Sequence, residues 1–438
     1  MEDTAGMVVI DLGLERGEPP TYDSPGRPTV PLWFPAAILA VVVLMLTAGS
    51  VAPARSPLAT IFRLQVGPAD TYALSGDGQL LAQTFGLLTS YDLTSGQMRW
   101  QAGQSTPAYR LRLSEDLVLM RPWTTGATEP GTTAVSVFTG ASQWERPGNV
   151  ITVAGSSRLL AVSSVRSLTG TGRRVQGPIE AVDSTTGRTL WTVPVPSTAV
   201  LLGVPGVADE SSRMLLVHDN RTFAVHDLDT GKLLATAKVP AADYNPDNPV
   251  VADGKILLRH PGEAGAEISA YDPVTLKQLW TEPAGSSYQM QACGVLACLS
   301  GAGGVRAIDP ATGDTLWTRR GWQEIEQFGT LFVAYGGTDG TIPLGVVDVE
   351  TGALRLSLRG WRPVTGGGED GNLLLVRAAD TRGRTMVAVA RPGDARPRVL
   401  GALPAGTGDC QAAPSRLVCR TMYGELVVWS YQESYQEG

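Results

Sequence analysis

A short pattern recurs along the chain from residue 60 onward, and it restricts the possible folds more than any other feature. In each copy an apolar segment is followed by Asp, two or three turn residues, Gly, and a Trp or aliphatic residue four positions after the Gly. The Asp places fall at residues 92, 136, 183, 227, 272, 309 and 348, at steps of 44, 47, 44, 45, 37 and 39 residues. Steps of this size and regularity indicate a repeat architecture, in which each copy is one structural module.

The copies differ in how many of the three motif residues they keep. Three copies are complete, namely Asp92, Gly96 and Trp100; Asp183, Gly187 and Trp191; and Asp309, Gly313 and Trp317. The others retain Asp227 and Gly231; Asp348 and Gly352; Asp272 and Trp280, with Leu276 in place of Gly; and Gly140 and Trp144, with Ser136 in place of Asp. An eighth place, near residues 387–393, keeps only its Gly.

The motif residues suit a hairpin of two strands. Asp accepts hydrogen bonds from the backbone of its own turn, and Gly adopts the positive φ that a tight turn requires. The Trp at the start of the second strand is large enough to be buried against a neighbouring module, which predicts a packing role; a ligand platform is the alternative.

Asp-Gly pairs at residues 77–78, 253–254 and 370–371 predict a second hairpin in several modules, with calcium binding as the alternative role of these acids. Two hairpins make a four-stranded sheet, and such sheets repeated around an axis form a β-propeller.

The best copies, residues 181–191 (AVDSTTGRTLW) and 307–317 (AIDPATGDTLW), share the pattern AxDxxTGxxxW. This pattern resembles the pyrroloquinoline-quinone (PQQ)-like, or quinoprotein-type, propeller repeat, and the resemblance covers about residues 60–431. Propellers similar in this way include the outer-membrane assembly scaffold lipoprotein and quinoprotein alcohol dehydrogenases. The resemblance implies an all-β fold, a PQQ-like β-propeller with about eight four-stranded blades, seven to nine being possible. Eight motif places favour eight blades, and a terminal strand at residues 425–432 leaves open a ninth set, in which residues 61–66 pair with that strand and close the ring.

The four cysteines form two local pairs, Cys293 with Cys298 and Cys410 with Cys419. Neither spacing is typical of a zinc site. Each pair brackets a short stretch that ends in an apolar segment, so neighbouring antiparallel strands could join the sulfurs as two disulfides. Disulfides require an oxidising compartment. Four free, buried thiols are the alternative.

Residues 32–51 (LWFPAAILAVVVLMLTAGSV) are mostly apolar, and no charged residue lies between Arg27 and Arg55. Twenty such residues are enough to cross a bilayer as a helix. We expect an uncleaved single-pass anchor that places the cysteine-containing part outside the cytoplasm. A signal peptide cleaved near residues 52–54 is the alternative.

The expected domain organisation has four parts. Residues 1–30 carry six acids and two bases and are expected to be a disordered cytoplasmic leader. Residues 31–53 are the transmembrane helix, residues 58–432 the propeller, and residues 433–438 a flexible tail. The expected localisation is the cell membrane, with the propeller on the extracytoplasmic side.

The sequence names no catalytic, cofactor-binding or metal-binding residue. It has no adjacent cysteine pair of the kind that PQQ enzymes of this repeat family use, and no hydrolase, metalloprotease or nucleotide-binding motif. His218 and His226 are expected to be structural, with a metal role as the alternative, and the polar segment 241–249 is expected to be a turn-rich loop, with a binding role as the alternative. The net charge of −7 and the absence of a Lys/Arg-rich run argue against nucleic acid as a partner.

Two functions fit these observations. The first is a non-enzymatic extracytoplasmic scaffold whose loops bind a protein, another ligand or an envelope component, without a cofactor. The second is a quinoprotein-like, PQQ-dependent oxidoreductase or small-ligand binder that uses the central channel. The second function requires converging polar or metal-binding residues on the inner strands.

Overall fold

The computed structural model describes residues 57–103, 108–122, 131–153, 155–167, 172–205, 212–240, 249–368, 371–378, 383–391 and 393–431, together with residues 31, 33–34 and 37–42 near the N-terminus. The chain divides into two compact units, Met1–Arg55 and Ser56–Gly438. In the first unit, residues 34 and 37–42 are helical. Among the described residues, no helix combines the length and apolar character needed to span a bilayer. Most of the predicted anchor, the whole leader 1–30 and the tail 433–438 lie outside the described residues.

The second unit is built from β-strands that group into consecutive sets of four. The first four sets are β2 (Tyr72–Leu74), β3 (Gln79–Thr84), β4 (Leu87–Asp92) and β5 (Met98–Gly103); β6 (Ala108–Ser114), β7 (Leu117–Pro122), β8 (Gly131–Ser136) and β9 (Ser142–Pro147); β10 (Asn149–Thr152), β11 (Leu159–Ser167), β12 (Arg173–Val182) and β13 (Thr189–Val193); and β14 (Ala199–Val204), β15 (Arg213–His218), β16 (Thr222–Asp227) and β17 (Leu233–Lys238). We call these sets blades 1 to 4.

Blades 5 to 8 continue in chain order. They are β18 (Pro249–Ala252), β19 (Lys255–Gly262), β20 (Gly265–Tyr271) and β21 (Gln278–Pro283); β22 (Ser287–Cys293), β23 (Leu296–Gly301), β24 (Gly304–Ile308) and β25 (Thr315–Arg319); β26 (Trp322–Phe328), β27 (Leu331–Gly336), β28 (Ile342–Asp348) and β29 (Ala353–Ser357); and β30 (Arg362–Pro363), β31 (Leu373–Ala378), β32 (Thr385–Ala390) and β33 (Arg398–Leu403). Blade 9 combines β34 (Thr407–Ala413), β35 (Arg416–Thr421) and β36 (Glu425–Tyr431) with the first strand of the unit, β1 (Leu58–Gln65).

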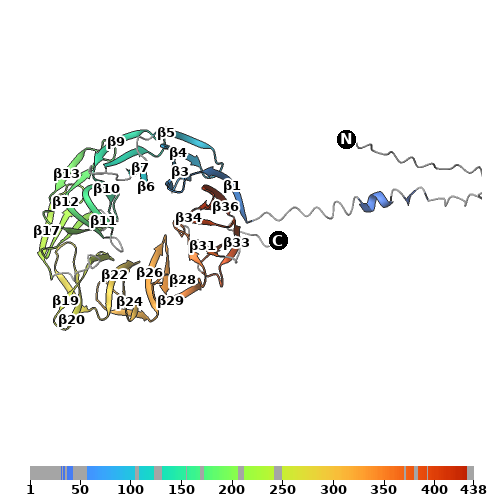
Figure 1. The fold of residues 1–438 in the computed structure, drawn as a ribbon. Coiled ribbons are helices and arrows are strands. Elements are labelled where there is room, and N and C mark those ends of the chain that lie inside the picture. Colours follow the sequence, from blue (N-terminus) through green and yellow to red (C-terminus); the bar gives the residue numbers. More distant parts are fainter. Residues whose placement is uncertain are drawn as a thin grey trace, which may run out of the picture. The chain divides into compact units, whose positions relative to one another are not determined.

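The described residues therefore form nine four-stranded blades, one more than the eight predicted and at the upper limit of the expected range. The ninth set was left open by the sequence and was not counted, because its third and fourth strands, β36 and β1, come from opposite ends of the unit and no Asp-Gly turn joins them. The two strands pair antiparallel from Leu58 opposite Tyr431 to Gln65 opposite Glu425, as the sequence predicts for the closing strands. Within Ser56–Gly438 the blades form a ring, with the first strand of each blade toward the centre and the fourth outside (Figure 1).

Blades 3 and 4 are joined into one sheet rather than separated. The start of β12 extends beyond its own blade and pairs with β14, with Arg173 opposite Leu201 and Val175 opposite Ala199. β12 is ten residues long, which gives it enough length to pair with β11, β13 and β14.

The repeated motif lies at the turn between the third and fourth strands. At Asp183 the side-chain Oδ1 accepts hydrogen bonds from the backbone N–H groups of Thr185 (3.1 Å) and Thr186 (2.7 Å). Hydrogen bonds from the Thr186 hydroxyl and backbone lower the pKa of Asp183. Gly187 has φ +69°, and Leu276, which replaces Gly in one copy, has φ +54°, so the left-handed conformation is kept where the glycine is lost.

Each motif Trp packs against the motif turn of the following blade. A Cβ atom at Gly140 would overlap the ring of Trp100, and one at Gly231 would overlap the ring of Trp191. The indole N–H groups donate to backbone oxygens of the next motif: Trp100 to Val137 (2.9 Å), Trp144 to Ser184 (2.8 Å), Trp191 to Asp229 (3.0 Å), Trp280 to Pro310 (3.0 Å) and Trp317 to Val349 (2.7 Å). Five interfaces between adjacent blades are thus linked by the same contact.

Apolar side chains fill the spaces between blades. Between blades 2 and 3, for example, Leu119, Trp144, Val150 and Val182 belong to one buried cluster. Both predicted disulfides are present, Cys293–Cys298 in blade 6 and Cys410–Cys419 between paired positions of β34 and β35. The free-thiol alternative is therefore wrong.

Candidate anion-binding site

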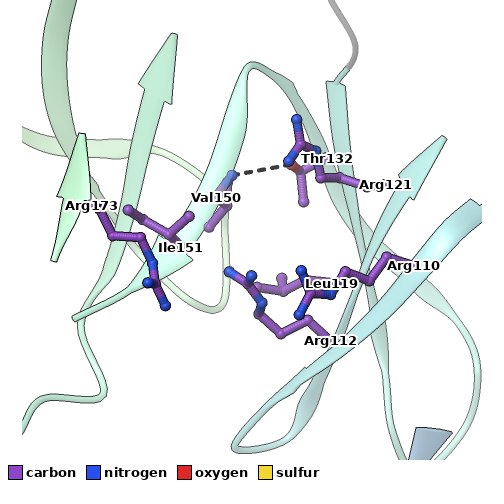
Figure 2. Close-up of a pocket in the computed structure, with 8 residues that line it drawn as sticks. All are labelled: Arg110, Arg112, Leu119, Arg121, Thr132, Val150, Ile151 and Arg173. Carbon is purple, nitrogen blue, oxygen red and sulfur yellow. Dashed lines mark hydrogen bonds between the residues drawn. The ribbon is translucent and has the colours of Figure 1, made fainter. Parts of the chain in front are cut away.

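A pocket between blades 2 and 3 gathers arginine side chains. It has a volume of about 70 Å³ and is lined by Arg110, Arg112, Leu119, Arg121, Thr132, Val150, Ile151 and Arg173. Figure 2 shows the arginines of blade 2 on one side and Arg173 of blade 3 on the other, with Val150 and Ile151 between them. We call Arg110, Arg112, Arg121 and Arg173 the arginine cluster.

Strand register explains why three of these arginines face blade 3. Arg110 and Arg112 are two residues apart on β6, so they share one face of the sheet. On β7 the residues opposite them are Arg121 and Leu119, respectively. Leu119 belongs to the buried cluster between blades 2 and 3, so its face is the one directed at blade 3. The three arginines therefore continue an apolar interface with cationic groups.

This arrangement brings like charges together. Arg110 and Arg121 are directly opposite each other on paired antiparallel strands, a placement that destabilises a sheet when both residues have the same charge. Arg112, Arg121 and Arg173 are half-buried, and Arg110 is exposed. Burial lowers the pKa of Arg112, and the positive charges of Arg110, Arg173 and Arg121 lower it further. Guanidinium groups nevertheless stay protonated in proteins, so the repulsion persists at any physiological pH.

The structure shows few internal partners for the arginine cluster. Arg173 Nη1 donates to Gly172 O at 3.3 Å, and the Arg121 guanidinium lies 5.5 Å from the ring centre of Tyr109. The Nε atom of Arg121 is buried without a hydrogen-bond partner. Within the described part of the chain, no Asp or Glu forms an ion pair with any of the four arginines. Four cations with free donors around one cavity are suited to hold an anion.

The floor of the pocket is held rigidly. Thr132 Oγ1 donates to Gly148 O (2.9 Å) and accepts from Val150 N–H (3.2 Å), the bond drawn in Figure 2. This pair of bonds connects β8 of blade 2 to the start of β10 in blade 3. Leu119 and Val150 are buried beside it. The distance between the two cationic walls is therefore set by the packing of two blades rather than by a loop.

The residues singled out in the sequence lie elsewhere. The motif Asp, Gly and Trp residues are at turns and on outer strands, and none of them lines the pocket. His226 Nδ1 lies 3.0 Å from Gly231 O, within its own motif turn. Burial and the nearby His226 lower the pKa of His218. Across the described residues, no group of three or more His, Cys, Asp or Glu side chains is placed to hold a metal ion. Residues 241–248 of the polar loop and Asp370 lie outside the described residues.

The arginine cluster was not predicted, because its four arginines form no continuous basic run in the sequence. The signal that could have found it is alternation: in YRLRLSEDLVLMRP, Arg110 and Arg112 alternate with apolar residues, and a short turn returns the chain to Arg121. Arg173 carries no comparable signal, because its place across the pocket depends on how two blades pack.

Part of the chain matches a known protein family. The family model described as outer membrane protein assembly factor BamB matches residues 175–334, or 160 of the 438 residues. None of the curated proteins searched matches the chain. Among solved structures, that of BamB from Moraxella catarrhalis is similar at a TM-score of 0.40 and 14% sequence identity, over 85% of this chain and 100% of that chain.

The fold is thus an all-β propeller of four-stranded sheets, and residues 175–334 carry a repeat of the PQQ-like, BamB-like kind. All four residues of the arginine cluster lie outside this matched segment. What the pocket does therefore has to be argued from its own geometry.

Proposed function

We propose that this protein is a membrane-anchored, extracytoplasmic propeller that acts as a non-enzymatic interaction scaffold and holds an anionic group of its partner in the arginine cluster. The observation that carries the proposal is the pocket with four cationic side chains and no ion-pair partner among the described residues. Half-buried charges of one sign cost stability when nothing compensates them, so such a cluster is best explained by a ligand that does so.

The scaffold role is also supported by the repeat. A propeller presents loops and strand ends on a rigid ring, and binding residues are commonly found on such positions. The family model that matches residues 175–334 is named for an assembly factor of outer membrane proteins. For this chain, we infer from that name only the general role of binding another protein.

The proposed location rests on two features. The disulfides Cys293–Cys298 and Cys410–Cys419 form in an oxidising compartment. The apolar residues 32–51 supply an anchor of sufficient length. In intact cells, all four thiols should resist alkylation until a reductant is added; their modification without reductant would contradict the location.

Proximity labelling in living cells tests the function. The full chain carries the labelling enzyme at its C-terminus and is compared with the double variant Arg112→Gln/Arg173→Gln, which removes one cation from each wall. The matched control is Arg188→Gln/Lys232→Gln, which removes two exposed cations from motif turns. We expect the pocket variant to lose specific labelled proteins that the wild type and the control both retain. An identical labelled set in all three would refute the interaction role of the pocket.

The proposed scaffold needs no cofactor, and this part of the proposal has its own test. PQQ is added to the purified full chain in detergent, and reduction of an artificial electron acceptor is followed with an alcohol as substrate. No reduction above a buffer control is expected. Turnover that depends on PQQ would replace the scaffold by the quinoprotein-like oxidoreductase.

A further inference from the structure

The size of the pocket limits what it can hold. The space inside it, about 70 Å³, is small, so a charged group of a few atoms enters it most readily. A larger ligand would place only its charged end there. The choice of anionic group is therefore set by four guanidinium groups on two facing walls.

We propose that the arginine cluster binds the phosphoryl group of a phosphate monoester; this inference rests on the proposed function and specifies its ligand. The charge balance favours a phosphoryl group over a carboxylate. A carboxylate supplies one negative charge and two oxygens, whereas a phosphate monoester supplies about −1.5 to −2 at neutral pH and three acceptor oxygens. A phosphate monoester therefore compensates four cations better than a carboxylate does.

The directions of approach favour the same group. Arg110 and Arg112 come from β6, Arg121 from β7 and Arg173 from β12 on the facing blade. A planar carboxylate can be held edge-on by one or two guanidinium forks, but donors arriving from opposite walls require oxygens that point in different directions. The tetrahedral phosphoryl group has this distribution of oxygens.

The remaining wall of the pocket is apolar. Leu119, Val150 and Ile151 are buried or nearly so beside the arginines. The apolar atoms next to the phosphoryl group of a monoester meet the exposed edge of this wall, and inorganic phosphate has no such atoms. The two sources of such a group, a soluble phosphate ester and the headgroup of a phospholipid such as phosphatidic acid, share this chemistry and are separated by the experiment below.

Calorimetric titration of the purified full chain in detergent tests the proposal at constant ionic strength. The probes are phenyl phosphate, inorganic phosphate and tricarballylate, a tricarboxylate whose negative charge is higher than that of a phosphate monoester. We expect phenyl phosphate to bind more tightly than inorganic phosphate and at least tenfold more tightly than tricarballylate. Tricarballylate binding as tightly as phenyl phosphate, or absence of phenyl phosphate binding, would overturn the phosphoryl assignment.

The pH dependence provides a second readout. Arginine does not titrate between pH 5 and 7.5, but a phosphate monoester loses its second proton near pH 6. If the cluster selects the dianion, the Kd of phenyl phosphate should rise about tenfold from pH 7.5 to pH 5. A Kd that does not change over this range would contradict recognition of the phosphoryl dianion.

Variants assign the binding to the pocket. Arg112→Gln/Arg173→Gln should weaken phenyl phosphate binding at least tenfold, and Arg188→Gln/Lys232→Gln should leave it unchanged. Circular dichroism melting shows whether each variant is folded. Equal loss in both variants would mean that general charge, and not the arginine cluster, binds the phosphate, which would overturn the assignment.

Vesicle flotation separates the two sources. The full chain is reconstituted into phosphatidylcholine vesicles and mixed with separate target vesicles, either phosphatidylcholine alone or phosphatidylcholine with phosphatidic acid. Cluster-dependent capture of the phosphatidic acid vesicles supports a lipid headgroup, and phenyl phosphate binding without capture supports a soluble ester.

Failure of phenyl phosphate to bind, together with a labelled set that still changes in the pocket variant, would refute the phosphoryl ligand but retain the scaffold. Binding of phenyl phosphate, together with a labelled set that does not change in the pocket variant, would retain the phosphoryl ligand but refute the interaction role of the pocket.

Discussion

Arginine has opposite roles at two interfaces between blades of this propeller. At the seam between blades 9 and 1, Arg420 donates from Nη1 to Gly67 O and from Nη2 to Asp70 O, each at 2.6 Å. Its Nε lies 3.3 Å from Asp409 Oδ2, and its guanidinium lies 5.6 Å from the ring centre of Tyr72. Between blades 2 and 3, by contrast, Arg121 faces Arg110 across the strands and its buried Nε has no partner.

The difference shows how to separate a structural from a binding role for the same residue type. At the seam every nitrogen of the guanidinium is occupied by the protein itself, so the side chain fastens the ends of the ring. In the arginine cluster the protein occupies few of the donors and the charges repel one another, which costs stability in the absence of a ligand. Substitutions at the two sites should therefore change the free energy of unfolding in opposite directions.

The largest effect is expected at the seam. Arg420→Ala removes two charge-assisted hydrogen bonds to Gly67 and Asp70 and should lower the free energy of unfolding by about 2–4 kcal/mol. Urea denaturation of the full chain in detergent measures the change. Arg188→Gln, at an exposed arginine of a motif turn, is the control and should change stability by less than about 0.5 kcal/mol. Equal stability of Arg420→Ala and wild type would mean that the seam is held by strand pairing alone.

The disulfide beside the seam should contribute somewhat less. Cys410 and Cys419 join β34 to β35 in blade 9, nine residues apart in sequence. Replacing both by Ala frees this loop in the unfolded chain and should cost about 2–3 kcal/mol. Denaturation of the variant is compared with that of Cys293→Ala/Cys298→Ala in blade 6. If only Cys293→Ala/Cys298→Ala lowered the free energy of unfolding, blade 9 would owe its stability to β1 and Arg420 instead.

Much of the fold was predictable because the repeat records it in local sequence. Gly187 and Asp183 specify a turn whose geometry depends only on their own backbone, and each of the eight copies keeps at least one of these two residue types. The number of blades was predicted less well than the repeat, in part because β1 and β36 are joined by no turn. In place of a motif Trp, Phe62 of β1 lies against Gly96 of blade 1. A phenylalanine in the first strand gives no local sign that it completes the last blade.

The candidate site was not predictable to the same extent. The alternation of Arg110 and Arg112 is local, and the turn to Arg121 could be predicted from the hairpin. Arg173, however, is brought to the pocket by the packing of blade 3 on blade 2. Local patterns describe a module, whereas a site between modules depends on their mutual placement, which no single copy of the repeat encodes.

At the arginine cluster the expected change in stability is smaller and of opposite sign. Arg112→Met keeps an apolar stem of similar length and removes a half-buried cation whose pKa is lowered by burial and by three neighbouring arginines. In phosphate-free buffer this variant should be about 0.5–1 kcal/mol more stable than wild type. Urea denaturation measures it, with Arg188→Gln again as control. Destabilisation by Arg112→Met would mean that the cluster has a structural role like that of Arg420.

Salt should produce the smallest change and the sharpest distinction between the two sites. Repulsion among partly exposed charges is screened as ionic strength rises, because the Debye length falls from about 10 Å at 0.1 M to about 3 Å at 1 M. The stability advantage of Arg112→Met should therefore shrink by a few tenths of a kcal/mol between about 0.05 and 0.5 M sodium chloride, because the Debye length shortens over this range. The cost of Arg420→Ala should persist, since the Arg420 side chain is only 16% exposed and bonds mainly to backbone oxygens. If salt reduced both differences equally, the contrast between a satisfied and an unsatisfied arginine would not explain the two interfaces.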